Sequence, residues 1–118
     1  MKRSDHKVGL IVATKDRPAE LRRLFKSLET QSYRLDEVII VDGGTQLVEN
    51  IVQEFPGLSI KYLRYLPPSA ARQRNIGIKT ISEELTLIGF LDDDTVLENN
   101  ALEAMMNFWE KALAPSSF

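Results

Sequence analysis

Four short apolar runs, rich in β-branched residues, recur along the chain with polar segments between them. They occupy residues 7–13, 37–41, 58–66 and 85–91. Runs of this length that end in turn-forming residues are typical of strands buried on both faces of a sheet. The third run alternates only partly between apolar and polar positions, and Pro67 and Pro68 end it. We therefore predict four strands.

After each run, apolar residues return at three- and four-residue spacing, which predicts amphipathic helices. The predicted helices cover residues 18–31, 47–55, 70–81 and 102–113. Pro18 suits the first turn of a helix, Asp16 is the expected N-cap of the first helix, and Ser69 is the expected N-cap of the third. The second helix is expected to stop at Pro56 and Gly57.

The repeated alternation of strand and helix predicts a single α/β domain that spans residues 1–118. Right-handed crossovers between the strands make the expected sheet mainly parallel and Rossmann-like, with helices on both faces. No second domain, internal repeat or low-complexity tract is evident in the sequence.

The composition of the chain excludes several classes of function. The chain has 15 lysines and arginines against 17 aspartates and glutamates, and its net charge of −2 argues against a nucleic-acid partner. The lack of cysteine excludes disulfides and thiolate sites, and the single histidine, His6, excludes a multi-histidine zinc site within one chain. No apolar run approaches the roughly 20 residues that span a bilayer, and the basic start reads as a strand rather than a signal peptide. We expect a cytoplasmic protein with no transmembrane segment.

Unusual polar residues gather where the predicted strands end. They are Thr14 to Arg17 after the first strand, Asp42 to Gly44 after the second, Arg72, Arg74 and Asn75 beyond the third, and Asp92 to Asp94 after the fourth. Ligands of open α/β sheets bind outside the carboxyl ends of the strands, where these segments meet. The sequence therefore predicts one site built from all four segments.

The aspartate triplet is the sharpest of these signals. Three adjacent carboxylates repel one another unless a cation is present, and magnesium and manganese prefer oxygen ligands. In an extended segment Asp92 and Asp94 point the same way, so the pair is suited to hold one metal together with a diphosphate. The simpler interpretation is a solvated acidic turn in which Asp94 or Thr95 caps the last helix.

Arg74 and Asp42 are the next candidates. Arg74, near a helix start, suits a phosphate or a base edge, although a surface arginine is the simpler interpretation. Asp42, at a strand end, is placed to accept a hydrogen bond from a nucleobase N–H or a ribose hydroxyl. The alternative is that its side chain stabilises the turn at Gly43 and Gly44.

Other conspicuous side chains have structural interpretations. Met105, Met106 and Trp109 recur at helical spacing and are expected in the core rather than around a cofactor. His6 is expected to be a solvated terminal residue, and Arg22 to lie on a solvated helix face.

Four motifs together resemble family 2 glycosyltransferases of the GT-A fold. Residues 8–18 (VGLIVATKDRP) are similar to that family's V-S-V-I-I-P-T-Y-N-R-P, and residues 39–45 (IIVDGGT) to I-I-V-D-D-G-S. Residues 71–77 (ARQRNIG) match A-x-x-R-N-x-G, and residues 90–94 (FLDDD) match the D-x-D strand end. The order of the motifs, each on the expected element, makes the resemblance fairly specific.

The resemblance implies roles for particular residues. The nucleotide-sugar site would comprise Ala13, Thr14, Asp16, Arg17, Asp42, Arg74, Asp92 and Asp93. Asp92 and Asp94 would bind Mn2+ or Mg2+, with Asp94 the direct ligand. The donor would be a nucleotide-diphosphate sugar, UDP-linked by resemblance, used in cell-envelope polysaccharide biosynthesis.

The chain also departs from the family pattern. Ala13 replaces the usual proline, and Lys15 and Asp16 replace Tyr-Asn. Gly43 replaces the second aspartate, which removes a uracil contact that the resemblance implies. Family members normally continue into an acceptor-binding half that supplies a catalytic carboxylate. We therefore expect this chain to be a donor-binding half, to lack a catalytic base, and to bind nucleotide weakly without transferring sugar. Its uncovered sheet edge is expected to favour a homo-oligomer.

Two other classes of protein fit the same pattern. A phospho-acceptor receiver domain has similar length and an acidic magnesium pocket, but it needs an acidic pair after the first strand, where this chain has Thr14, Lys15 and Asp16. A non-catalytic interaction domain would keep the fold and bind neither nucleotide nor metal.

Overall fold

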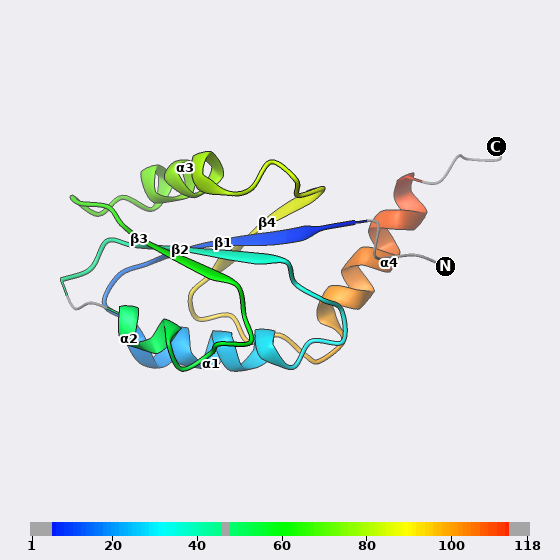
Figure 1. Cartoon of the computed structure of the whole chain (residues 1–118), viewed down its shortest axis with the longest axis horizontal. Coiled ribbons are helices and arrows are strands. Elements are labelled where there is room, and N and C mark those ends of the chain that lie inside the picture. Colours follow the sequence, from blue (N-terminus) through cyan, green and yellow to red (C-terminus); the bar gives the residue numbers. More distant parts are fainter. Residues whose placement is uncertain (1–5, 46–47, 114–118) are drawn as a thin grey trace.

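The computed structural model describes residues 6–45 and 48–113, which form a layered α/β structure (Figure 1). The strands are β1 (Val8–Thr14), β2 (Glu37–Asp42), β3 (Ile60–Arg64) and β4 (Leu87–Asp92). The helices are α1 (Pro18–Glu29), α2 (Glu49–Val52), α3 (Ala70–Thr80) and α4 (Ala101–Leu113). None of the helices in this part of the chain has the length and apolar character that a membrane crossing requires.

All of the strands run parallel, in the order β3-β2-β1-β4. Thr14 at the end of β1 lies opposite Asp42, and Ala13 lies opposite Asp92. Helices α1 and α2 lie below the sheet in Figure 1, α3 lies above it, and α4 lies beyond the end at which β1 begins. The predicted parallel sheet with helices on both faces is confirmed.

The central strands β1 and β2 are buried on both faces, as apolar runs without strict alternation predict. The core cluster on the α1 face contains Leu10, Val12, Val38, Ile40, Leu21, Leu24, Phe25 and Leu28. The cluster on the α3 face contains Ile11, Ile39, Val41 and Ile81. The cluster that attaches α4 contains Val8, Tyr33, Leu102 and Met106. The packed sheet thus forms a rigid support for the loops at its carboxyl ends.

The second helix and the third strand are shorter than predicted. The amides of Glu54 and Phe55 bond to carbonyls three residues earlier, at 3.0 and 3.1 Å, so tight turns follow α2 in place of further helix. Phe55 is still buried, with its ring centroid 5.4 Å from that of Phe25. The apolar spacing of this segment therefore reflects burial rather than a long helix. Leu47, assigned to the same helix, lies outside the described residues.

The start of α1 also differs from the prediction. Arg17, not Asp16, occupies the N-cap position, and no side chain caps it. Asp16 has a φ of 53°, in the left-handed region that aspartate tolerates better than most residues. The prediction for α3 is confirmed, since Ser69 Oγ accepts a hydrogen bond from the amide of Arg72 at 3.3 Å.

Helix α4 carries only part of the core that the sequence predicts. Met106 is buried, as expected, but Met105 is 49% exposed, so the prediction for Met105 is wrong. The helix lies at one end of the sheet and turns one narrow face inward.

A glycine lets α3 approach the sheet closely. A Cβ on Gly77 would lie 2.5 Å from Cγ2 of Ile11, a fully buried residue of β1. The helix buries Gln73 and Gly77 rather than large apolar side chains, so its backbone lies near the strands. The glycine of the A-x-x-R-N-x-G segment thereby has a packing role.

Replacement of Gly77 by alanine is expected to lower the free energy of unfolding by about 1–2 kcal/mol. Overpacking against Ile11 costs about 1–3 kcal/mol, and up to about 1 kcal/mol is regained from helix propensity. Denaturant unfolding of the variant measures the difference. Gly57→Ala is the matched control, because nothing lies within 4 Å of the added methyl group. Equal stability of the two variants would contradict the close approach.

Candidate functional site

A pocket of about 400 Å³ opens at the carboxyl ends of β1 and β4, beside the start of α3. Its lining residues are Ala13, Thr14, Lys15, Arg17, Pro68, Ser69, Ala70, Gln73 and Asp93. Strands β2 and β3 lie on one side of β1, and β4 lies on the other side. The pocket at the end of β1 therefore lies where the strand order reverses. Ligands of open α/β sheets bind at such points. Four residues of the predicted site therefore line one pocket.

Arg17 joins the loop after β1 to the aspartates after β4. Its Nε lies 3.1 Å from Asp93 Oδ1, and its Nη2 lies 3.5 Å from Asp94 Oδ2. Thr14 Oγ1 donates to the other oxygen of Asp93 at 2.9 Å. Burial raises the pKa of the Asp93 carboxyl, although the Thr14 bond and the Arg17 charge oppose the rise. A buried acid with a raised pKa at a pocket wall is typical of functional sites.

Arg74 reaches the aspartate triplet from α3. Its Nη2 lies 3.9 Å from Asp92 Oδ1, and the two side chains are 41% and 76% exposed. The structure thus brings Arg74 and the end of β4 together, as the sequence analysis requires. An arginine from each side, Arg17 and Arg74, faces the three carboxylates.

The triplet does not continue the strand, however. β4 ends at Asp92, and a turn follows in which the amide of Thr95 donates to the carbonyl of Asp92 at 3.1 Å. Asp93 consequently faces β1, while the Asp94 side chain is 58% exposed. The alternation expected of an extended segment therefore does not apply beyond Asp92. The capping interpretation is wrong, because α4 begins only at Ala101.

The carboxylates suit a metal that is shared with a ligand rather than a closed metal cage. Among residues 6–45 and 48–113, no three acidic or histidine side chains are grouped as a metal site requires. Asp92 and Asp94 are exposed, however, and Mg2+ commonly uses one or two protein carboxylates and completes its shell with phosphate and water. The residues present fit a metal held in that way.

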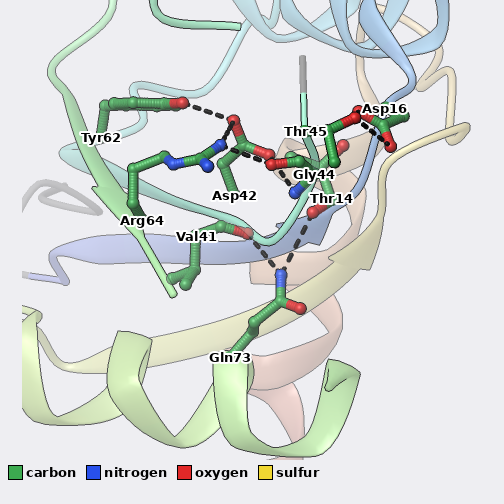
Figure 2. A network of polar contacts seen from close by, with 9 residues as sticks. All are labelled: Thr14, Asp16, Val41, Asp42, Gly44, Thr45, Tyr62, Arg64 and Gln73. Carbon is green, nitrogen blue, oxygen red and sulfur yellow. Dashed lines mark hydrogen bonds and ion pairs between the residues drawn. The ribbon is translucent and has the colours of Figure 1, made fainter. Parts of the chain in front are cut away.

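Asp42 is the centre of a buried polar network at the ends of β2 and β3 (Figure 2). Its side chain is fully buried, and it accepts hydrogen bonds from the Tyr62 hydroxyl, from Arg64 Nη1 at 3.3 Å and from the amide of Gly44 at 2.9 Å. Arg64 Nη1 also donates to the carbonyl of Gly44 at 2.7 Å. Burial and the neighbouring Asp42 raise the pKa of Tyr62.

This network favours the turn interpretation of Asp42, since the carboxylate holds the Gly44 amide. A contact from Asp42 to a nucleobase stays a prediction, and because the carboxylate is fully buried, it requires the residues that cover Asp42 to move. Sequence reasoning missed Tyr62 and Arg64. The available signal was strand alternation, which puts these two residues on one face of β3, together with the register that sets Arg64 opposite Asp42.

Gln73 connects the strand ends with α3 (Figure 2). Its side-chain amide donates to the carbonyls of Val41 and Thr14 at 2.7 and 3.2 Å, and its carbonyl oxygen accepts from the amide of Ser69 at 3.0 Å. The side chain is 3% exposed. Gln73 was not predicted as a site residue, because it is uncharged and the charged residues Arg72 and Arg74 on either side of it are the more conspicuous candidates.

The position of Gln73 explains why glycine, rather than the second aspartate of the family pattern, stands at position 43. A Cβ on Gly43 would lie 2.6 Å from Oε1 of Gln73 and 3.0 Å from Cβ of Pro68. A second aspartate in the D-D-G-S position would therefore require Gln73 to move. Asp16 lies beside the same loop, with its carboxylate oxygens 3.4 and 3.5 Å from the Thr45 hydroxyl.

Two known proteins are similar in sequence to this chain. Minor teichoic acid biosynthesis protein GgaA of Bacillus subtilis (strain 168) is 34% identical over 79 residues, which are 62% of this chain and 17% of that protein. Glycosyltransferase GlyA of Streptococcus pneumoniae serotype 4 is 28% identical over 104 residues, which are 86% of this chain and 15% of that protein. The chain thus spans less than a fifth of the length of these relatives.

Solved structures show the same fold. TarS 1–349 of S. aureus, solved with UDP-GlcNAc, has a TM-score of 0.76 at 23% identity, over 89% of this chain and 31% of that one. The mannosyltransferase PcManGT from Pyrobaculum calidifontis, solved with GDP-Man and Mn2+, has a TM-score of 0.75 at 20% identity, over 92% and 33% of the two chains. These likenesses establish a GT-A fold.

The family comparison covers most of the chain. The sequence model for glycosyl transferase family 2 matches residues 10–114, which include three of the quoted motifs in full and the first motif from residue 10 onward. The match favours the glycosyltransferase interpretation over the receiver domain. With its strand order, its aspartate-ended β4 and this match, the chain belongs to glycosyl transferase family 2.

Proposed function

We propose that this chain binds the nucleotide-diphosphate sugar from which a family 2 glycosyltransferase transfers its sugar to an acceptor hydroxyl. The observation that carries the proposal is the meeting of Arg17, Arg74 and the three aspartates beside the pocket at the strand-order reversal. The structures of TarS with UDP-GlcNAc and of PcManGT with GDP-Man support the class of ligand.

The chemistry of the leaving group explains this combination of charges. Breaking a sugar–phosphate bond leaves a nucleoside diphosphate with additional negative charge. Arg17 and Arg74 now pair with carboxylates, and each guanidinium has further donors that suit phosphate oxygens. Positioned cations that meet developing charge lower the barrier of such a step. The pocket of about 400 Å³ that Arg17 lines is where we place the nucleotide portion of the donor.

Asp92 and Asp94 would hold the divalent metal, Mn2+ or Mg2+. When bound, the metal supplies Lewis-acid stabilisation of the leaving diphosphate. Asp92 pairs with Arg74 and Asp94 pairs with Arg17, and both carboxylates are exposed, so they would offer oxygen ligands without enclosing the ion. Asp93 is occupied by Thr14 and Arg17 and holds the turn against β1.

We assign no catalytic base to this chain, because the strand-end aspartates are engaged with cations and with Thr14. UDP is the nucleotide we propose, on the resemblance and on the TarS structures. GgaA, whose name refers to teichoic acid biosynthesis, supports a place in cell-envelope polysaccharide synthesis. A cytoplasmic location remains a prediction from the sequence.

Calorimetric titration with UDP and GDP, with and without MnCl2, tests the proposal. We expect weak binding of UDP, with a dissociation constant of about 0.1–1 mM, that depends on the metal. Asp94→Ala is expected to weaken this binding by about tenfold or more, since it removes a carboxylate that the metal needs.

Glu83→Ala is the matched control, because it removes an exposed carboxylate at the other end of β4 and changes the net charge equally. If it weakens binding as much as Asp94→Ala does, general charge rather than a metal site explains the effect. Absence of binding by the wild-type chain to either nucleotide would favour the non-catalytic interaction domain.

A further inference from the structure

Asp93 differs from the other two aspartates of the triplet because its side chain is buried. The side chains of Asp92 and Asp94 are 76% and 58% exposed, whereas that of Asp93 is 12% exposed. Removal of a carboxylate from water is costly unless positive charge and hydrogen bonds compensate for it. A solvated acidic turn would leave all three carboxylates in water, so the burial of Asp93 requires a separate explanation.

Both oxygens of the Asp93 carboxylate have partners, which come from the first strand and from the loop that follows it. Oδ2 accepts a hydrogen bond from the hydroxyl of Thr14, a residue that is 3% exposed at the end of β1. Oδ1 lies 3.1 Å from Nε of Arg17. The first contact fixes the carboxylate against the sheet, and the second joins the fixed carboxylate to a long side chain at the pocket. Asp93 thus relates the position of the Arg17 guanidinium to that of β1.

The other contact of the Arg17 side chain, within the described part of the chain, is weaker. Arg17 occupies the N-cap position of α1 without a capping hydrogen bond from its side chain, which is 44% exposed. Its Nη2 lies 3.5 Å from Asp94, whose carboxylate is exposed, and pairs between exposed charges contribute little. An arginine has many rotamers, and selection of one rotamer costs entropy on binding unless the protein has selected it beforehand. The contact with Asp93 makes that selection.

The pocket has to accept an anion although an acidic residue lines it. Arg17 and Asp93 both line the pocket in which we place the nucleotide. An unpaired carboxylate there would repel phosphate, and the charge of Arg17 offsets that repulsion while the two side chains are paired. The guanidinium has N–H groups beyond those that face Asp93 and Asp94, and these suit phosphate oxygens.

We propose that Asp93 is a positioning residue of the donor site, which holds the Arg17 guanidinium in place for the diphosphate. The inference rests on the proposed function, because the diphosphate is the ligand that Arg17 would meet. The two oxygens of Asp93 stay with Thr14 and Arg17, so Asp93 acts on the donor only through Arg17. Simple electrostatics predicts that removal of an acid favours an anionic ligand, whereas positioning predicts that removal of Asp93 weakens binding.

A double-mutant cycle with Asp93→Ala and Arg17→Gln tests the proposal, with the affinity for UDP in the presence of MnCl2 as the readout. We expect Asp93→Ala to weaken binding by about fivefold and Arg17→Gln by about tenfold. The double variant should bind no more weakly than Arg17→Gln alone. Asp93→Asn keeps one acceptor oxygen and should lose less affinity than Asp93→Ala. Circular dichroism verifies the fold of each variant, and Asp93→Asn takes the place of Asp93→Ala in the cycle if the alanine variant does not fold.

Glu20→Gln is the matched control. It removes the same charge from the first turn of α1, where Glu20 lies near enough for its charge to act on the Asp93 carboxyl. Glu20 does not belong to the described lining of the pocket. Glu20→Gln should therefore bind UDP about as well as the wild-type chain. If it weakens binding as much as Asp93→Ala does, loss of charge rather than loss of positioning explains the effect, and the proposal is wrong.

Nuclear magnetic resonance reports on the Arg17 guanidinium without any nucleotide. The Nε–Hε signal that Arg17→Gln removes should lie apart from the signals of solvated arginines in the wild-type chain, and it should move to their position in Asp93→Ala. A solvated Arg17 signal in the wild-type chain overturns the proposal. So does a folded Asp93→Ala variant that binds UDP as tightly as the wild-type chain, or one whose loss of affinity persists in the Arg17→Gln background, because Asp93 then acts by another route.

Failure of the proposed function gives a different result. A wild-type chain that binds no nucleotide contradicts the proposed function, and the Arg17 signal alone then decides whether Asp93 fixes the guanidinium. A signal that moves in Asp93→Ala supports that positioning, and a signal that does not move overturns it.

Discussion

Asp42→Ala is expected to lower the free energy of unfolding by about 2–4 kcal/mol. Loss of one member of a buried ion pair typically costs about 3–5 kcal/mol, and the partial exposure of Arg64, 31%, reduces that value. The substitution also leaves the Tyr62 hydroxyl and the Gly44 amide without their acceptor. Urea unfolding monitored by circular dichroism measures the change.

Two controls distinguish the loss of the buried hydrogen-bond network from the loss of one negative charge. Asp94→Ala removes an exposed carboxylate of the same charge and should change stability by less than about 0.5 kcal/mol. Asp42→Asn keeps one acceptor oxygen and should fall between Asp42→Ala and the wild-type chain. A loss below about 1 kcal/mol for Asp42→Ala would show that the network contributes little.

Gln73→Leu is expected to lower the free energy of unfolding by about 2–3 kcal/mol. The leucine keeps the approximate volume but removes three hydrogen bonds from a residue that is 3% exposed. Each bond contributes about 1 kcal/mol, and the Ser69 amide that loses its acceptor adds a desolvation penalty. Denaturant unfolding gives the difference.

Gln53→Leu is the appropriate control, because Gln53 is exposed at the end of α2. Its stability should stay close to that of the wild-type chain. Gln73→Leu should also weaken UDP binding, since Gln73 lines the pocket and fixes the start of α3 relative to β1. Equal stability of the two leucine variants would show that the strand ends keep their positions without the amide.

The sheet was predictable because its signal is local. Residues 8–13 and 38–41 are continuous apolar runs, and such runs with helices between them admit few arrangements. Chain order, however, does not state how far a helix extends. The segment after β2 buries Ile51 and Phe55 at helical spacing, yet only Ile51 lies in α2, and tight turns position Phe55. A burial pattern alone therefore overestimates the length of α2.

The site was predictable only in outline. Arg17, Arg74 and Asp93 were identified because charged residues after strands are conspicuous, and the structure brings them to one place. Gln73 and Tyr62 were not, because their roles arise from neighbours distant in the sequence. Gln73 bonds to Thr14, 59 positions away, and Tyr62 bonds to Asp42 across a strand pair. Such partners depend on strand order and register, which no single motif encodes.

The placement of α4 has a practical consequence. The helix lies beyond the amino ends of the strands (Figure 1), whereas the pocket lies at their carboxyl ends. The chain has no cysteine, so a thiol introduced at the exposed Phe108 would be unique. Coupled through that thiol to a sensor surface or a fluorophore, the protein would keep the end that carries the pocket exposed to solution, where binding of the proposed nucleotide can be measured.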